Sequence, residues 1–230
     1  METTMTNEPL ADARDMFTIH TMFRREFGLM PGLVREVAPG DGQRAALVAD
    51  HVVFVSTVLD FHHSAEDKHV WPRLRERCPG DCAALVDVME DQHHTIHGCL
   101  LQVTEAQQAW RDSPTADTRD ALAHAVDQFL AALTEHLALE EERVVPLIGK
   151  HITQAEWDLV AQEGGAEFPP DKLPTIFGMV QYEGDPEIID MIVSQMPPEA
   201  QPVIKDVAAQ AYAAYAKELY GTATPPRVRA

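Results

Sequence analysis

Hydrophobic residues recur every three or four positions along most of residues 8–150, which is the period of an α-helix that buries one face. Clusters rich in proline, glycine, serine and aspartate interrupt this pattern at residues 39–42, 79–81 and 112–115. The pattern therefore predicts four helices, at about residues 10–38, 43–78, 82–111 and 115–149. Long helices joined by short turns pack side by side, so we expect an all-α fold, an antiparallel up-down four-helix bundle.

Each of the four predicted core faces contains histidine or glutamate near its middle. His20 interrupts the first hydrophobic stripe and His93 the third, while the second and fourth each contain a histidine followed by a glutamate. Imidazole and carboxylate groups in a hydrophobic core cost free energy unless they are paired or coordinate a metal. Because four helices present such groups at once, the sequence predicts a metal site inside the bundle.

The spacing of these residues suits coordination. Residues four apart on an α-helix differ by about 40° around the axis and lie about 6 Å apart along it, so both side chains can reach one metal centre. Counted from the turns, the histidines also lie at comparable heights on the four helices. The predicted metal ligands are His20, His62, Glu66, His93, His97, His136 and Glu140.

The mixture of imidazole and carboxylate favours iron, with manganese as the alternative, over a thiolate-rich zinc site. Di-iron sites in helical bundles use carboxylates to bridge the two ions, because an anionic bridge offsets the repulsion between them. We therefore expect two non-haem iron ions, with Glu66 and Glu140 as bridges and the histidines as terminal ligands. One coordination position would then stay open for dioxygen, peroxide, nitric oxide or another small molecule.

The other histidines are weaker candidates. Whether His63, next to His62, also binds metal is left open by the spacing. The same holds for His69, which shares the face of His62 and Glu66 one turn further on. The remaining histidines are expected to be structural or exposed, because they lie too far from the group or on another face: His51, His94, His124 and His151.

Residues 151–230 differ in composition and contain no motif for chemistry. Gly164, Gly165 and the proline pair at residues 169–170 predict a linker, followed by helices at about residues 186–196 and 199–220. The tyrosines of this segment fit a packing stripe. We expect a helical C-terminal extension of the bundle.

The net charge of −19 argues against binding to nucleic acid or to an anionic membrane surface. No signal peptide or membrane-spanning segment is expected, which makes the cytoplasm the default location. Cys78, Cys82 and Cys99 are too few for a disulfide framework, so we expect ordinary thiols and a reducing compartment.

Three segments resemble the motifs of the hemerythrin-like, or HHE cation-binding, family. They are Phe61 to Pro72, Asp91 to His94 and His136 to Pro146, and the resemblance covers about residues 10–150. It implies the same ligand set, in the order His, His-x3-Glu, His-x3-His and His-x3-Glu. The segment after residue 150 resembles the C-terminal extensions of actinobacterial members.

One departure from oxygen-carrying hemerythrins bears on function. Those proteins end the last motif with an aspartate five residues after the histidine, whereas here Glu140 follows four residues after His136. Glu141, five residues on, would point about 140° away in a regular helix. Three functions therefore stay open, namely reversible dioxygen binding, an enzyme acting on peroxide, nitric oxide or a small substrate, and an iron-responsive or iron-holding module.

Overall fold

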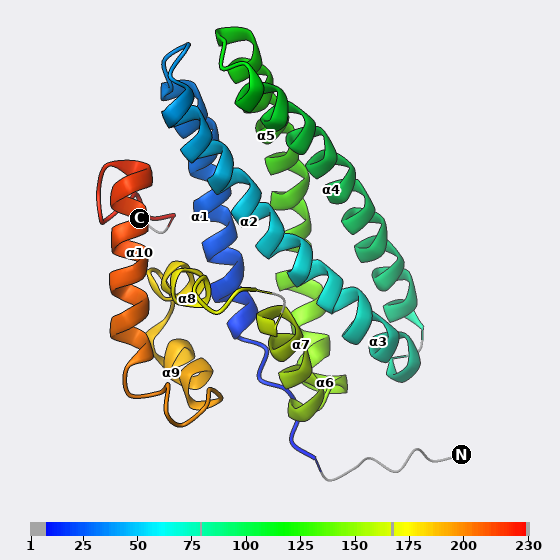
Figure 1. Ribbon diagram of the computed structural model, residues 1–230. Helices are drawn as coiled ribbons and strands as arrows, with labels where there is room; N and C mark the ends of the chain where they lie inside the picture. Colours follow the sequence, from blue (N-terminus) through cyan, green and yellow to red (C-terminus); the bar gives the residue numbers. More distant parts are fainter. Residues whose placement is uncertain (1–7, 79, 167, 229–230) are drawn as a thin grey trace.

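The computed structural model describes residues 8–78, 80–166 and 168–228 and contains only helices and connecting segments over that part of the chain. The predicted all-α fold is confirmed. A core of four long helices forms its centre (Figure 1): α1 (Asp15–Glu36), α2 (Gly42–His69), α4 (Asp81–Asp112) and α5 (Ala116–Leu139).

Successive turns between these helices lie at alternating ends of the core, with the α3–α4 turn opposite the other two (Figure 1). The α1–α2 and α4–α5 turns meet at one end, where the Gly40 amide donates to the Pro114 carbonyl at 2.7 Å. Side-chain caps start both following helices, because Asp41 accepts from the Arg44 amide and Thr115 forms a capping box with Thr118. The predicted helix boundaries at this end are correct within two residues.

The second and fourth helical segments are each irregular near their C-terminal ends, where we predicted regular helices. Pro72 and Pro146 lie at these irregular points, because proline has no amide hydrogen and its ring collides with the preceding turn. After α2 the chain turns at Val70 into α3 (Trp71–Arg77). After α5 it forms the π-helical turn η1 (Glu140–Val144) and then α6 (Val145–His151).

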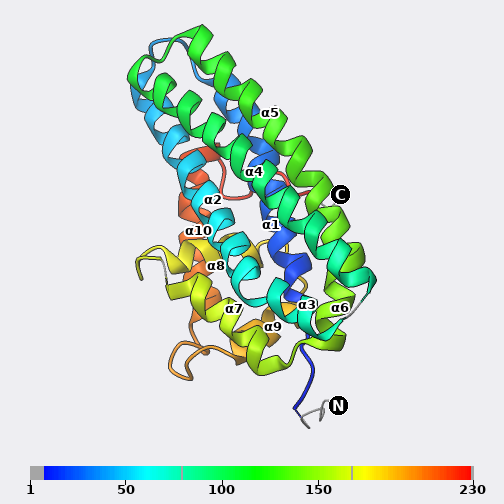
Figure 2. The ribbon, with the colours of Figure 1, turned by 90° about the vertical axis from the view of Figure 1, so that its right-hand side faces the viewer.

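The C-terminal extension contains more helix than predicted. Its helices are α7 (Gln154–Ala166), α8 (Leu173–Gln181), α9 (Pro186–Ser194) and α10 (Ile204–Tyr220). The expected linker is wrong where α7 and α8 form, since Gly164 and Gly165 lie in the last turn of α7 and Pro174 lies in the first turn of α8, where proline is tolerated. α7 packs on α2, and α8 packs on both α1 and α10 (Figures 1 and 2).

A buried carboxylate fixes this extension to the bundle. Glu26 of α1 is fully buried and accepts hydrogen bonds from the Tyr212 and Tyr220 hydroxyls of α10, each at 2.7 Å. Arg25 donates to the same carboxylate at 2.9 Å and to the Met179 carbonyl of α8. The tyrosines therefore pack as predicted, and they also satisfy a charge that would otherwise be costly in the core.

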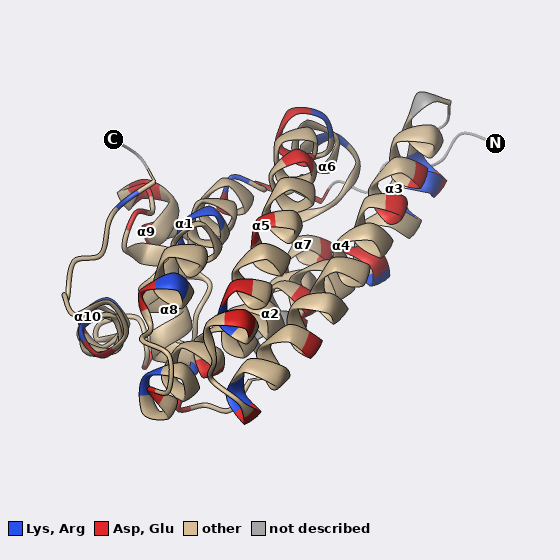
Figure 3. Ribbon diagram, turned by 90° about the horizontal axis from the view of Figure 1, so that it is seen from above, with Lys and Arg blue, Asp and Glu red and all other residues tan. Residues whose placement is uncertain are grey.

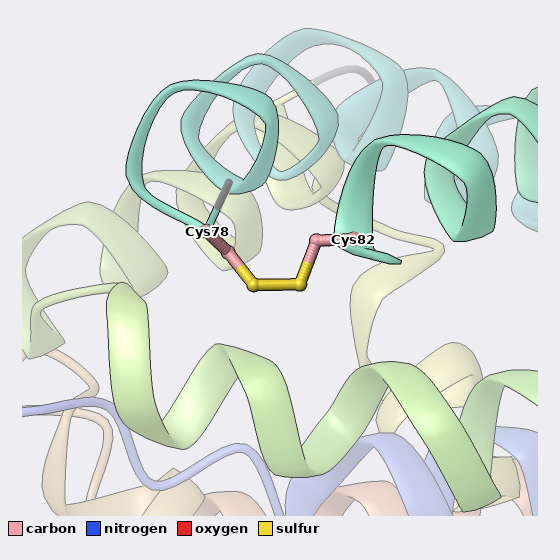
Figure 4. Close-up of a disulfide and its surroundings, with 2 residues drawn as sticks. All are labelled: Cys78 and Cys82. Carbon is pink, nitrogen blue, oxygen red and sulfur yellow. A yellow bond between two sulfur atoms is a disulfide. The ribbon is translucent and has the colours of Figure 1, made fainter. Parts of the chain in front are cut away.

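Cys78 and Cys82 form a disulfide between the end of α3 and the start of α4 (Figure 4). The prediction of ordinary thiols is wrong for this pair and holds for Cys99, which is free. The sequence spacing of four residues did not reveal the pairing, which depends on where α3 ends and α4 begins. The thiols therefore give no support for a reducing compartment.

One continuous stretch, Gly42–Arg77, is long and apolar enough by length and composition to cross a membrane. A core helix of a soluble protein meets the same criteria, and this stretch carries the buried residues His63 and Glu66 inside the bundle. Acidic residues are spread over several helices instead of gathering on one (Figure 3). Both features are consistent with a soluble protein.

Asp15, at the start of α1, provides a test of the contact between α7 and the bundle. Its carboxylate accepts from the Trp157 indole of α7 at 3.1 Å, and burial raises the pKa of Asp15 to about 6. A raised carboxyl pKa stabilises the fold only while the group is protonated, so this contribution is lost as the pH rises from about 4 to about 6. We expect Asp15→Asn to remove about 2–3 kcal/mol of this pH dependence.

Urea unfolding of the wild type and Asp15→Asn across this pH range measures the effect. Asp206→Asn, which removes an exposed carboxylate of α10, is the control. Its stability is expected to depend on pH as that of the wild type does. Parallel stability curves for all three proteins would contradict the prediction.

Candidate metal centre

Two overlapping groups of histidine and glutamate lie in the bundle core, between its middle and the end that contains the α3–α4 turn. Their ligand atoms lie within 4.8 Å of one another in each group, and both groups could hold a metal ion. One group contains His20, His62, Glu66 and Glu140, and the other contains His63, Glu66, His93 and His136. Helices α1, α2, α4 and α5 with η1 all contribute, as the sequence predicted.

The two glutamates lie between the groups. Glu66 places Oε1 3.1 Å from the His62 Nε2 and Oε2 3.6 Å from the His93 Nε2. Glu140 places Oε2 3.4 Å from the His20 Nε2 and 3.5 Å from the His136 Nε2. Each carboxylate therefore faces histidines of both groups, which is the arrangement that a bridge between two cations requires.

Most of the inward-facing atoms have no hydrogen-bond partner among the described residues. They are both carboxylate oxygens of Glu66 and Glu140 and the Nε2 atoms of His63, His93 and His136. Native proteins seldom leave so many buried polar atoms unpaired, because each costs about 1–3 kcal/mol. Cations placed among these atoms would remove that cost, so the residues present fit a metal centre.

Outer hydrogen bonds orient three of the histidines. The Nδ1 atoms of His20, His93 and His136 lie 3.1, 2.7 and 3.2 Å from side-chain oxygens of Glu141, Asp67 and Gln92. Since an oxygen of this kind accepts, each Nδ1 carries the proton and each Nε2 presents a lone pair to the centre. This is the tautomer that metal coordination needs.

Two of these outer carboxylates are themselves held in place. Asp67 also accepts from the Trp71 indole at 2.8 Å, and Glu141 accepts from Arg24 at 2.6 Å. Trp71 lies four residues after Asp67, the spacing at which two side chains meet on one helix face. A contact along the helix therefore holds the carboxylate that orients His93.

Burial controls the charges in this centre. It lowers the pKa of His20, and burial together with neighbouring imidazoles lowers the pKa of His62 and His63 well below the usual range and that of His136 to about 2. Burial raises the pKa of Glu66 well above its usual range and that of Glu140 to about 8. The imidazoles are thus neutral and able to donate lone pairs, whereas the carboxylates need a nearby cation to ionise readily.

Six of the seven predicted ligands lie in the two groups, and the placement expected of His97 is wrong. The His97 side chain is 63% exposed, and its Nδ1 lies 3.8 Å from the Asp60 carboxylate. His93 already lies at the edge of the core face, and the further 40° to His97 turns that side chain toward solvent. His63 supplies the remaining imidazole instead, and the adjacent pair His62 and His63 was the sequence signal for it.

The other histidines lie outside both groups. His51 is buried but bonds the Tyr215 hydroxyl at 2.8 Å, and His69 pairs with Glu163 of α7. The remaining side chains are not part of the centre: His94, His124 and His151.

Glu141 belongs to neither of the two groups. The residue lies in the π-helical turn η1, where hydrogen bonds span five residues, so its rotation relative to His136 differs from that in a regular helix. Its carboxylate lies against His20 on the outer side of the centre. Glu141 therefore orients a ligand, while Glu140 faces the inward nitrogens.

Comparison with protein families adds an independent observation. A family profile described as hemerythrin HHE cation binding domain matches residues 12–148, which is more than half of the chain and includes every member of both groups. Neither the curated proteins nor the solved structures contain a significant match.

Metal analysis of variants tests the choice between His63 and His97. We expect His63→Ala to lose bound metal after anaerobic reconstitution, because one group loses an imidazole, and His97→Ala to retain it. Elemental analysis measures the metal, and circular dichroism checks that both variants are folded. Equal metal loss in the two variants, or loss only in His97→Ala, would contradict the assignment.

A second prediction concerns the outer carboxylate Asp67. Asp67→Asn keeps an oxygen for hydrogen bonding but removes the negative charge that makes His93 a stronger donor. Metal affinity, measured by competition with a chelator, is expected to fall roughly 10–100-fold. Asp91→Asn, an exposed change on the same helix as His93, is the control and should leave the affinity unchanged. A similar affinity for all three proteins would show that Asp67 does not support the centre.

Proposed function

The chain belongs to the hemerythrin HHE cation-binding family, and on that premise we propose that it is a non-haem di-iron protein that binds or reacts with dioxygen, peroxide or a related small molecule. Its four core helices, running alternately up and down, hold two iron ions between them, with manganese as the alternative metal. Glu66 and Glu140 bridge the ions, and five imidazoles complete the two sites.

The observation that carries this proposal is the pair of buried glutamates that face histidines of both groups and whose oxygens have no hydrogen-bond partner among the described residues. A single cation would leave one of the two groups without compensation for its buried carboxylate and imidazole atoms. Two cations joined by carboxylates satisfy both groups together. The family profile supports cation binding independently of the geometry.

Two bound irons supply reversible one-electron chemistry for dioxygen or peroxide. The chain's own residues bind and orient the ions and limit access of water. Phe23 packs on the His62 ring at a centroid distance of 5.3 Å, and Leu59 and Leu133 are buried in the surrounding core. Arg24 keeps Glu141 ionised beside His20, so that the imidazole proton stays on Nδ1 and Nε2 remains free to bind.

A metal-responsive module is the second candidate function, and the unpartnered core atoms favour it. Without cations these atoms destabilise the bundle, so metal binding would raise its stability and report metal supply. A catalase-like or oxidase enzyme is the third candidate, and it alone requires repeated conversion of peroxide or another small substrate. The position of Glu140 four residues after His136 separates this chain from the oxygen-carrying pattern and leaves these alternatives to experiment.

Anaerobic reconstitution with ferrous iron, followed by separate exposure to dioxygen and peroxide, tests the proposed function. We expect about two irons per chain and a new near-ultraviolet absorption band on exposure, measured by elemental analysis and optical spectroscopy. Evolution of dioxygen from excess peroxide would identify an enzyme, whereas a large fall in melting temperature on chelation without any spectral reaction would identify the metal-responsive module. Failure to retain iron would overturn both.

A further inference from the structure

We propose that the seam between α2 and α4 is the route by which small uncharged molecules reach the metal centre. Asp60 and His97 lie at the end of the seam that is nearest the centre. This inference rests on the proposed function, because it assigns the access path and the selectivity of that same centre. His97, which lies outside both groups, thereby has a place in the protein's chemistry.

A groove of about 220 Å³ follows this seam and opens to solvent. Val52, Ser56 and Asp60 of α2 form one wall, and His97, Leu101 and Thr104 of α4 form the other. The extension packs on other sides of the bundle, since α7 lies along the far part of α2 and α8 packs on α1 (Figures 1 and 2). The seam above α7 is left uncovered by helices in Figure 2.

Two pairs of side chains cross the seam in successive helical turns. Asp60 and His97 form the outer pair, with side chains 57% and 63% exposed. His63, three residues after Asp60, and His93, four residues before His97, form the inner pair, and their rings stack at a centroid distance of 4.1 Å. A turn of helix rises about 5.4 Å, so the outer pair lies directly next to two members of the metal centre.

The centre approaches solvent at this seam. His63 and His93 are 7% and 6% exposed, whereas His20, His136 and both glutamates are fully buried. His62, at 9%, is the other partly exposed member. His63 and His93 are the members of the centre that adjoin the groove between α2 and α4.

The walls of the groove determine what can pass. Its volume corresponds to roughly seven water molecules at ~30 Å³ each, which admits dioxygen, peroxide, nitric oxide or a very small organic molecule. Asp60 lies at the inner end and Asp67, half exposed, lies against His93, so negative charge surrounds the path. Anions are repelled there, and the apolar side chains Val52 and Leu101 favour uncharged molecules.

A blocking variant tests the route. Leu101 is 54% exposed and lines the groove, so Leu101→Trp fills it without disturbing the core. Val88→Trp is the matched control, because Val88 is 44% exposed on the same helix and does not line the groove. We expect the association rate of nitric oxide with the ferrous protein to fall roughly tenfold in Leu101→Trp, a barrier increase of ~1.4 kcal/mol, and to stay unchanged in Val88→Trp.

Stopped-flow absorption measures these rates, and elemental analysis confirms equal iron content in all proteins. An unchanged rate in Leu101→Trp, or equal slowing in both variants, would overturn the proposed route while the iron content still supported a metal centre. Loss of iron from the wild type would instead overturn the proposed function.

A charge variant tests the selectivity. Asp60→Asn is expected to speed the binding of azide to the ferric protein roughly two- to threefold at low ionic strength, because it removes repulsion at the inner end. The rate for uncharged nitric oxide should not change. Asp117→Asn, an exposed change on α5, is the control. Equal azide rates in Asp60→Asn and the wild type would contradict the assigned selectivity.

Discussion

The burial of two carboxylates among neutral imidazoles is the constraint on which the rest of this structure depends. Glu66 and Glu140 have no exposed surface, and none of their four oxygens has a hydrogen-bond partner in the part of the chain that the structure describes. Carboxylates in such a place are tolerated only when cations share them. The four helices that bring the imidazoles around them therefore form a site whose buried carboxylates a bound cation would compensate.

Another buried glutamate of the same bundle shows how different this situation is. Glu26 is equally inaccessible, but two tyrosine hydroxyls and Arg25 donate to it, and the resulting network joins α1 to the C-terminal extension. A carboxylate with its hydrogen bonds complete needs no cation. Glu26 thus joins helices through hydrogen bonds, whereas Glu66 and Glu140 face histidines that could share a cation with them. The difference lies in the side chains that the neighbouring helices place beside each carboxylate.

The two helix breaks connect the fold to the site. In both halves of the bundle a His-x3-Glu motif is followed six residues after the glutamate by a proline, Pro72 or Pro146. Near the first, Trp71 donates to Asp67, which holds His93, and the second includes the π-helical turn from which Glu141 reaches His20. Residues at the ends of these helical segments therefore orient histidines on other helices. The same irregularity was invisible in a simple helical period.

The sequence alone determined the helical class, the helix boundaries at the α1–α2 and α4–α5 turns and six members of the two groups, because helical periodicity and i, i+4 spacing are local properties. Tertiary structure decided the rest. Whether His63 or His97 faces the centre depends on how α4 is rotated against α2. On α4, the 40° between His93 and His97 separates a side chain of the centre from a solvent-exposed one. The Cys78–Cys82 disulfide likewise depends on where α3 ends and α4 begins, and the direction of Glu141 depends on the π-helical turn η1.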